Sequence, residues 1–299
     1  MQPLRNEQKK EQPSTYFVED RQNEDELARL TIQDQMLTNA MGGVLPEQSD
    51  PTAFRRVLDV ACGTGGWLIE MAQTFPTMML VGIDISKRMI DYAREQAAAA
   101  GVADRIEFLV NDATLMLEFP SDYFDLTNLR AGSSFLRTWD WRKMLSELFR
   151  VTHVGGVIRV TDAALGGETS SPALARLTDM LRCAFYRSGH YFTDEAGGVT
   201  DHLERLLVQH CGQHVYTRSY VVEFRAGTEQ GKALYNDIGN LYRTARPFIK
   251  KWGCITDDYD TLCQQAQNEM QRPDFYGRGT HLTAWHIKSS PPSQRPRIE

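Results

Sequence analysis

Two hydrophobic patterns alternate through the first part of the chain. Short apolar runs of strand length occupy 57–60, 79–84, 106–110, 123–129 and 157–161. Between these runs, apolar residues recur at three- and four-residue intervals, which is the spacing of one helix face. Strands that alternate with helices of this length indicate right-handed βαβ crossovers and a parallel sheet. The pattern therefore predicts an α/β fold.

The simple alternation ends after Asp162. Helical spacing then predicts two helical segments before a strand at 215–224, two more helices, and a last strand at 280–287. The stretches 163–195 and 226–279 thus add helices to the minimal alternation. Both are expected to leave from the carboxyl ends of strands, the edge at which open parallel sheets bind ligands. We expect these insertions to form a lid over a site at that edge.

The N-terminal part is more polar. Residues 1–22 carry one apolar group, Tyr16-Phe17-Val18, and are expected to form a flexible arm. Asn23 and Glu26 have the spacing of a capping box, which predicts a helix that ends at Gly42-Gly43. Its expected apolar face consists of Leu27, Leu30, Leu37 and Met41. The expected division is an arm and lid helix at 1–50, a main domain at 51–288, and a disordered Pro-rich tail at 289–299.

Composition narrows the classes of function. No apolar run approaches the roughly 18 residues of a membrane span, and the N-terminus is too polar for a signal peptide. We therefore expect a cytoplasmic protein without a membrane partner. The five cysteines show no metal-ligand spacing, which favours reduced thiols and no metal site. With 39 acidic against 33 basic residues, a net charge of −6 and no basic stripe, nucleic acid is not an expected partner.

The first strand passes into a glycine-rich turn. An acidic residue, Asp59, stands within the apolar run, and Gly63, Gly65 and Gly66 follow it. Such a loop lets a ligand approach the backbone closely beside a helix N-terminus, as dinucleotides and S-adenosylmethionine do. A dinucleotide fingerprint requires a third glycine where Leu68 stands. By itself the loop is also compatible with any βα turn.

The loop resembles the first motif of the class I S-adenosylmethionine-dependent methyltransferases. The resemblance is closest to the ubiquinone/menaquinone-methyltransferase-like small-molecule group, and it covers residues 57–162. It extends to Phe124-Asp125 and to Arg150-Val151-Thr152-His153-Val154-Gly155-Gly156, where Val154 replaces a proline of the family pattern. Ala61 replaces the first glycine of the loop motif. The resemblance implies a Rossmann-like, doubly wound seven-stranded sheet with helical lid insertions, and S-adenosyl-L-methionine as cofactor with S-adenosyl-L-homocysteine as product.

The resemblance also implies roles for residues at the strand ends. Asp84, 21 residues after Gly63, would accept both ribose hydroxyls, and Asp112 would accept the adenine amino group. Asn128 would present its backbone carbonyl to the methionine ammonium, with Asp59 acting there directly or through water. A turn-forming role is the alternative for Asp112. The expected cofactor-binding residues are Tyr16, Asp59, Ala61, Cys62, Gly63, Gly65, Asp84, Ile85, Met89, Asp112, Ala113 and Asn128.

The acceptor is expected beside the cofactor, beyond the carboxyl ends of the strands. His190 is the candidate base, with an exposed loop histidine as the alternative. Methyl transfer gains most from alignment and exclusion of water, so a fixed base is not obligatory. Other acceptor-binding candidates are Arg130, Ser133, Asp162 and Tyr191. Aromatic residues that would line a pocket or pack in the core are Phe135, Trp139, Phe185, Tyr186, Tyr191, Phe192, Tyr235 and Tyr242.

These features predict a methyltransferase that acts on oxygen, nitrogen or carbon of a small hydrophobic or aromatic metabolite, in a reaction typical of secondary metabolism. Leu129-Arg130 after Asn128 departs from the Asn/Asp-Pro-Pro-aromatic pattern of amino-group methylation on nucleobases. The alternatives are a non-methylating S-adenosylmethionine-fold protein, either a binding module or a cofactor-assisted enzyme, and a nicotinamide-dependent oxidoreductase. The protein is expected to be a monomer or a homodimer.

Overall fold

The computed structural model describes residues 15–18 and 24–289, and a seven-stranded sheet forms its centre. The strand order is β3-β2-β1-β4-β5-β7-β6, with β7 antiparallel to both of its neighbours and the other pairs parallel. The strands are β1 (Arg56–Val60), β2 (Met79–Asp84), β3 (Ile106–Val110), β4 (Phe124–Arg130), β5 (Thr152–Ala163), β6 (Val215–Arg225) and β7 (Tyr276–Ile287). The Rossmann-like, doubly wound sheet is confirmed.

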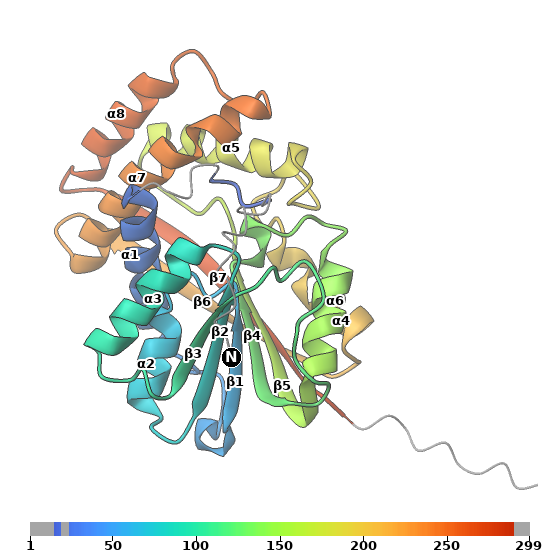
Figure 1. Ribbon diagram of the computed structural model, residues 1–299. Helices are drawn as coiled ribbons and strands as arrows, with labels where there is room; N and C mark the ends of the chain where they lie inside the picture. The colour runs from blue at the N-terminus through green and yellow to red at the C-terminus, as the bar shows by residue number, and fades with distance from the viewer. Residues whose placement is uncertain (1–14, 19–23, 290–299) are drawn as a thin grey trace, which may run out of the picture.

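Helices cover both faces of the sheet (Figure 1). On one side lie α2 (Gly66–Thr74) and α3 (Lys87–Ala99), and on the other lie α4 (Trp141–Val151) and α6 (Thr200–His210). Each pair buries its apolar stripe against the sheet, since Trp67 and Leu68 of α2 and Trp141 and Leu145 of α4 are fully buried. The sheet is therefore the middle layer of three, with a hydrophobic core on each side.

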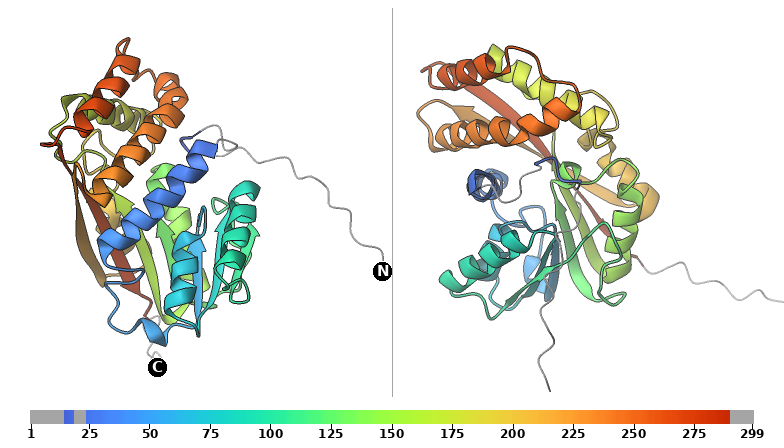
Figure 2. Two further views of the ribbon diagram at one scale, coloured as in Figure 1. Left: turned by 90° about the vertical axis from the view of Figure 1, so that its left-hand side faces the viewer. Right: turned by 45° about the horizontal axis from the view of Figure 1, so that its top comes forward.

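Further helices stand above the carboxyl ends of the parallel strands (Figures 1 and 2). We call α5 (Pro172–Arg187), α7 (Glu229–Lys251) and α8 (Tyr259–Met270) the helical cover. They lie in the two stretches that sequence assigned to a lid. Helix α1 (Glu24–Met41) packs along α7, between the cover and α2.

Several boundaries and packing faces differ from expectation. Strand β5 starts at Thr152, before Gly155-Gly156, because Thr152 pairs with Phe124 ahead of an irregularity in which β5 has extra residues between Thr152 and Val157. In α1 the buried residues include Glu26 and Arg29, whereas Leu27, Leu30 and Leu37 are only partly buried. The predictions for residues 1–14, for the cap at Asn23 and for the tail at 290–299 lie outside the described residues.

The cysteines also depart from expectation. Cys183 of α5 and Cys254, just after α7, form a disulfide with a Cα–Cα distance of 6.0 Å. Cys62, Cys211 and Cys263 are free thiols. The prediction that every cysteine is reduced is therefore wrong for this structure, and spacing could not reveal a pair 71 residues apart.

Two further features concern the described part of the chain, residues 15–18 and 24–289. None of its helices combines the length and hydrophobicity that crossing a lipid bilayer requires. Within the same residues, no cluster of three or more His, Cys, Asp or Glu side chains is arranged to hold a metal ion.

Candidate cofactor and acceptor site

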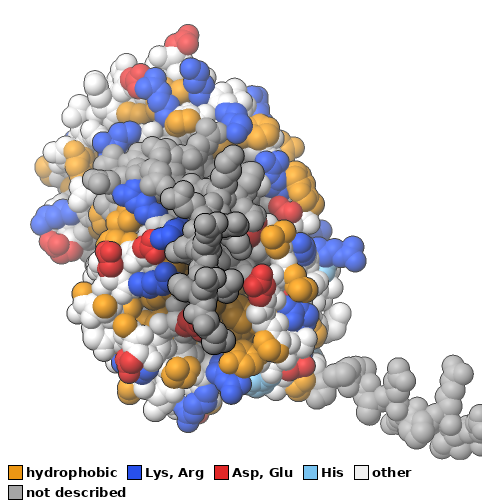
Figure 3. All heavy atoms as spheres, viewed as in Figure 1, with side chains coloured by type: hydrophobic (Ala, Val, Ile, Leu, Met, Phe, Trp, Pro, Cys, Tyr) orange, Lys and Arg blue, Asp and Glu red, His pale blue; other side chains and the backbone are white. Residues whose placement is uncertain are grey.

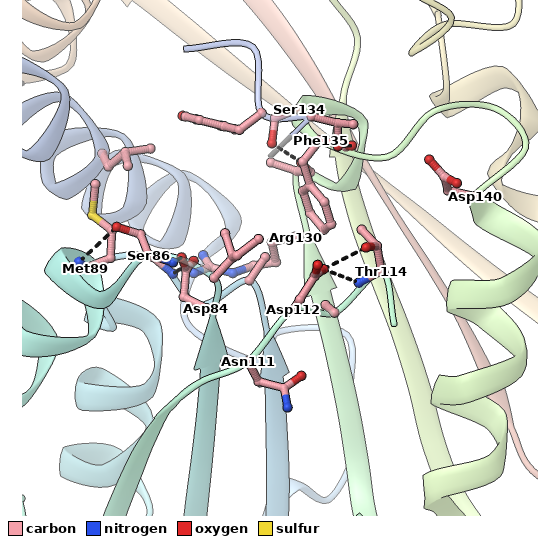
Figure 4. Close-up of a pocket in the computed structure, with 18 of the residues that line it drawn as sticks. Asp84, Ser86, Met89, Asn111, Asp112, Thr114, Arg130, Ser134, Phe135 and Asp140 are labelled. Atoms are coloured by element: carbon pink, nitrogen blue, oxygen red, sulfur yellow. Dashed lines mark hydrogen bonds between the residues drawn. The ribbon is translucent and has the colours of Figure 1, made fainter. Parts of the chain in front are cut away.

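A cavity of about 390 Å³ opens at the carboxyl edge of β1, β2, β3 and β4 (Figure 4). One part of its lining comes from the loops that follow the strands, and the other from the N-terminal segment, α1 and residues 134–140. The strand-side residues are Ala61, Gly63, Asp84, Ile85, Ser86, Met89, Asn111, Asp112, Ala113, Thr114, Arg130 and Ala131. The opposite residues are Thr15, Tyr16, Glu26, Leu30, Ser134, Phe135, Arg137, Trp139 and Asp140.

Asp84 ends β2 and is held by backbone groups on both sides. Its Oδ2 accepts a hydrogen bond from the Gly63 N–H at 3.0 Å, and its Oδ1 accepts one from the Ser86 N–H at 2.8 Å. Gly63 has φ of +54°, a conformation that favours glycine and turns this N–H toward the carboxylate. The carboxylate is thus fixed between the glycine loop and the start of α3, and it lines the cavity.

Asp112 follows β3 and forms a turn with Thr114. Its Oδ1 accepts hydrogen bonds from the Thr114 N–H at 2.9 Å and the Thr114 hydroxyl at 2.7 Å (Figure 4). The turn-forming alternative is therefore present, and the residue also lines the cavity. Neighbouring Asn111 has a buried Oδ1 without a partner among the described residues. Sequence did not single out Asn111.

A chain of buried polar groups lies beneath the glycine loop. Arg159 Nε donates to Glu47 Oε1 at 2.7 Å, and Arg159 Nη1 donates to Asn128 Oδ1 at 2.8 Å. This contact turns the Asn128 amide so that its Nδ2 donates to Asp59 Oδ1 at 2.8 Å. Asp59 Oδ2 remains buried and without a hydrogen-bond partner in the described structure. Burial raises the pKa of Asp59 to about 6, against the opposing effect of Arg130.

The expected contact of the Asn128 backbone carbonyl with the methionine ammonium stays a prediction, and the structure assigns the side chain another contact. Strand β4 continues to Arg130, and Asn128 is a fully buried residue that does not line the cavity. Its side chain holds Asp59 and has no direct access to a ligand in the cavity. Glu47 and Arg159 were missed by sequence reasoning. The available signal was a charged residue, Arg159, inside the apolar run of β5.

The N-terminus of α2 faces a carboxylate from α1. A Cβ at Gly66, the first residue of α2, would overlap the Asp34 carboxylate. Asp34 also forms an ion pair with Arg130 at 2.6 Å. In dinucleotide-binding proteins the cofactor pyrophosphate occupies such a helix N-terminus. A protein carboxylate in this place repels that group, which counts against a nicotinamide dinucleotide.

Comparison with known proteins agrees with this geometry. Residues 57–156 match the family model described as a methyltransferase domain. The U6 snRNA (guanine-N(2))-methyltransferase THUMPD2 of Bos taurus is 33% identical over 150 residues, which cover 48% of this chain and 27% of that protein. The demethylmenaquinone methyltransferase of Deinococcus radiodurans is 39% identical over 102 residues, which cover 34% of this chain and 40% of that enzyme.

A solved structure extends the likeness over most of the chain. Haemonchus contortus phosphoethanolamine N-methyltransferase 2, in complex with phosphomonomethylethanolamine and S-adenosylhomocysteine, superposes with a TM-score of 0.55 at 18% identity. The superposition covers 92% of this chain and 60% of that one. The chain carries a class I S-adenosylmethionine-dependent methyltransferase domain. The matches to the two curated relatives span only 27% and 40% of their lengths, so they characterise this domain.

S-adenosylmethionine is the cofactor of the methyltransferase domain. The residues at the strand ends fit it chemically, because its ammonium and adenine amino groups are hydrogen-bond donors. Asp84 and Asp112 line the cavity, and Asp59 lies buried beneath it with an Oδ2 that has no hydrogen-bond partner among the described residues. Of the twelve residues expected at the cofactor, Asp59, Cys62, Gly65 and Asn128 do not line the cavity. The others do: Tyr16, Ala61, Gly63, Asp84, Ile85, Met89, Asp112 and Ala113.

The N-terminal segment closes the methyltransferase cavity from above. The Tyr16 hydroxyl donates to Glu26 at 2.5 Å and accepts from Arg29 at 3.1 Å. Arg29 also pairs with Asp237 of α7 at 3.4 Å. Burial raises the pKa of Tyr16 well above its usual value, so the phenol stays neutral. The helical cover therefore reaches the site through α1.

His190 is not an exposed loop residue. Its side chain is buried behind the cavity lining, with Nδ1 2.7 Å from the Ser188 hydroxyl and Nε2 3.0 Å from the Thr15 carbonyl. A carbonyl can only accept, so Nε2 carries the proton. Burial lowers the pKa of His190 to about 4. The imidazole holds the segment at Thr15 in place, and this geometry gives it no access to an acceptor.

The other acceptor candidates divide in a similar way. Arg130 lines the cavity, whereas Ser133, Asp162 and Tyr191 are buried behind it. Asp162 accepts from the Ser133 hydroxyl at 2.7 Å and from its N–H at 2.9 Å, so it fixes the turn before Phe135. Among the aromatic candidates, Phe135 and Trp139 line the cavity. The other candidates lie elsewhere: Phe185, Tyr186, Tyr191, Phe192, Tyr235 and Tyr242.

The expected lid residues are also placed differently. No residue of 163–195 or 226–279 belongs to the cavity lining of the described chain. Their helices pack on α1 and on one another, as the contacts of α1 with α7 and of α5 with α8 show. The insertions thus support the wall of the cavity without forming it.

Proposed function

We propose that this methyltransferase domain transfers the methyl group of S-adenosylmethionine to a small acceptor with an apolar or aromatic portion. The observation that carries the proposal is the two-sided lining of one cavity. Carboxylates at the strand ends suit the cofactor, and Leu30, Phe135 and Trp139 on the opposite side suit an apolar body. The cavity of about 390 Å³ must also hold the cofactor, so the part of the acceptor that enters it is small.

The cofactor would be held by three carboxylates at three strand ends. Asp84 would accept from the ribose hydroxyls, and Asp112 from the adenine amino group. Asp59 is buried beneath the glycine loop and does not line the cavity, so it would act on the methionine ammonium through a water, with Oδ2 as the acceptor because Oδ1 is already bound by Asn128. Bound in this way, the cofactor supplies an electrophilic methyl group on a sulfonium.

The protein's contribution to the reaction would be positioning and exclusion of water. None of the described histidines lines the cavity, and His190 is engaged on both ring nitrogens. Tyr16 closes the site as a neutral phenol. The arrangement suits an acceptor whose nucleophilic atom needs no dedicated histidine base.

RNA is a weaker candidate for the acceptor. The chain has a net charge of −6, and on the face shown in Figure 3 basic and acidic side chains are interspersed. A protein that binds nucleic acid needs a clustered basic surface for phosphate contacts. One relative acts on U6 snRNA, so RNA belongs among the substrates to be tested.

The first experiment is a calorimetric titration with S-adenosylhomocysteine. Asp84→Ala should weaken binding about 100-fold. It removes the two hydrogen bonds that the carboxylate would accept from the ribose hydroxyls, and each contributes about 1.5 kcal/mol. Asp91→Ala is the matched control, since Asp91 is an exposed carboxylate on α3 that pairs with Lys87. Equal affinity in both variants would refute the cofactor arrangement.

The second experiment identifies the acceptor class. The wild-type protein is incubated with S-adenosylmethionine and either a pool of small metabolites or total RNA. Release of S-adenosylhomocysteine that depends on the metabolite pool supports the proposal, and mass spectrometry of the product locates the methyl group. Turnover that depends on RNA alone would refute a small acceptor. Binding without turnover in both pools would favour a non-methylating binding protein.

A further inference from the structure

One arginine at the cavity has no acidic partner within the part of the chain that the structure describes. Arg29 pairs with Glu26, Arg130 with Asp34, and Arg159 with Glu47. The guanidinium of Arg137 lines the same cavity but makes no hydrogen bond or ion pair within residues 15–18 and 24–289, and its Nε is buried. The guanidinium lies over the Trp139 ring, with 5.4 Å between its Cζ and the ring centroid.

The carboxylates that line the acceptor side of the cavity are occupied elsewhere. Asp140 Oδ2 accepts from the backbone N–H of Arg137 at 3.0 Å, which closes the turn and makes no ion pair with the guanidinium. Glu26 binds Arg29 through both oxygens. His190 lies behind Arg137 and stays neutral at physiological pH, because burial lowers its pKa to about 4. The Arg137 guanidinium therefore has no ion-pair partner among the described residues, and the nearby Asp140 carboxylate is directed to the backbone of the turn.

The backbone around Arg137 is held in place. The Thr138 N–H donates to the Gly189 carbonyl at 2.8 Å, which joins the loop to the end of α5. A Cβ on Gly189 would come within 3.0 Å of the Trp139 ring, so this position keeps the indole close to the backbone. Trp139 is 63% exposed, so one side of the indole is open to a ligand while the guanidinium of Arg137 lies over the ring. The Arg137–Trp139 pair thus forms a fixed cationic and aromatic surface at the cavity.

We infer that Arg137 binds an anionic group of the methyl acceptor, a carboxylate or a phosphate, while Phe135 and Trp139 contact the acceptor's apolar part. An ion left unpaired at a partly buried site is costly, and a ligand anion removes that cost. The planar guanidinium matches two oxygens of a carboxylate or phosphate, and stacking on an indole preserves its orientation. The inference rests on the proposed function and narrows its substrate class to acidic small molecules.

The test uses three probes that share one ring: benzoate, phenyl phosphate and the neutral benzamide. Their dissociation constants are measured by ligand-observed NMR on the full chain saturated with S-adenosylhomocysteine. Wild type should bind at least one anion about tenfold more tightly than benzamide, and the preferred anion separates a carboxylate site from a phosphate site. Arg137→Gln should reduce this ratio to near one, and Arg137→Lys should retain part of it.

Controls separate this inference from the proposed function. Arg142→Gln removes an exposed arginine on α4, outside the cavity, and should keep the wild-type ratio. Affinity for S-adenosylhomocysteine and the melting temperature should change little in Arg137→Gln, which excludes loss of the fold or of the cofactor site. An unchanged ratio in Arg137→Gln would overturn the inference. So would equal affinity of the wild type for benzamide and for both anions, or no binding of either anion to the wild type at millimolar concentration.

Discussion

The strand-end region and the helical cover contribute to the cavity in different ways. At the strand ends, Asp84 and Asp112 are fixed by backbone N–H groups, and the Ser86 and Thr114 groups lie only two residues away in sequence. The cover reaches the cavity through side chains distant in sequence, as in the Arg29–Asp237 pair that joins α1 to α7. One region carries the residues proposed to bind the cofactor, and the other holds the wall that closes over the cavity.

This difference predicts which substitutions should affect cofactor affinity and which should affect stability. Local turns form the proposed cofactor site, so its affinity for the cofactor should tolerate loosening of the helices above it. The wall at Tyr16 depends on the buried charges of Glu26, Arg29 and Asp237. Removal of one partner of a buried ion pair strongly destabilises the fold, because the other charge stays buried and unpaired. Stability and cofactor affinity should therefore respond to different residues.

The largest expected effect separates stability from affinity. Replacing both Cys183 and Cys254 with serine should reduce the free energy of unfolding by about 4 kcal/mol, because the disulfide closes a long loop of the unfolded chain. The two cysteines are 71 residues apart, one in α5 and the other just after α7 of the cover. Urea unfolding measures this loss, and calorimetry with S-adenosylhomocysteine should show less than a threefold change in affinity.

Cys263→Ser provides the control for this prediction. Cys263 also belongs to the cover, in α8, but it is a free thiol and should be nearly neutral on replacement. If loss of the disulfide reduced the free energy of cofactor binding as much as the free energy of unfolding, the strand-end region and the cover would not be energetically separable.

A smaller effect concerns the contact between the cover and the N-terminal segment. The folded-state pKa of His190 is about 4, below its ordinary value of 6.5, so the unfolded chain takes up the proton first as pH falls. The neutral imidazole therefore contributes to the free energy of unfolding in full above pH 6.5, and this contribution is lost as the pH falls toward 4. The loss between pH 7 and pH 5 is about 2 kcal/mol. Urea unfolding at both pH values should show this extra loss in wild type relative to His190→Gln. Equal pH dependence in the two proteins would contradict the burial of a neutral imidazole.

The smallest expected effect tests the strand-end region by itself. Burial raises the pKa of Asp59 to about 6, so the carboxyl becomes protonated below that pH. Affinity for S-adenosylhomocysteine should fall about tenfold from pH 7 to pH 5, because one unit below a pKa roughly one carboxyl in ten is ionised. Asp59→Asn should bind weakly with little pH dependence over this range. A flat profile in wild type would argue against contact between Asp59 and the ammonium.

Sequence predicted the elements whose signals are local. The apolar runs and the glycine loop marked the strands and the first turn, and the resemblance placed Asp84 and Asp112 at strand ends that do line the cavity. Contacts between distant residues gave no such signal. The closeness of Asp34 to Gly66 depends on how α1 packs, and so does the burial of Glu26 and Arg29, which lie outside the expected apolar face.

Aromatic and histidine candidates show the same limit. Spacing could not separate Phe135, which faces the cavity, from Phe185, which packs in the core. It also placed His190 in a loop without showing that Ser188 and Thr15 enclose it. Burial and partners of a polar group are decided by tertiary packing, and a single sequence does not report them.

The pairing of Arg159 with Glu47 limits how far the chain can be shortened. A fragment that starts at residue 51, the predicted beginning of the main domain, lacks Glu47 and also the Val44 carbonyl that accepts from the Trp67 indole. Trimming there would leave a guanidinium in the protein interior without its anion, a loss that typically costs about 3–5 kcal/mol. The smallest fragment that keeps the sheet intact must therefore include the residues from Val44 onward.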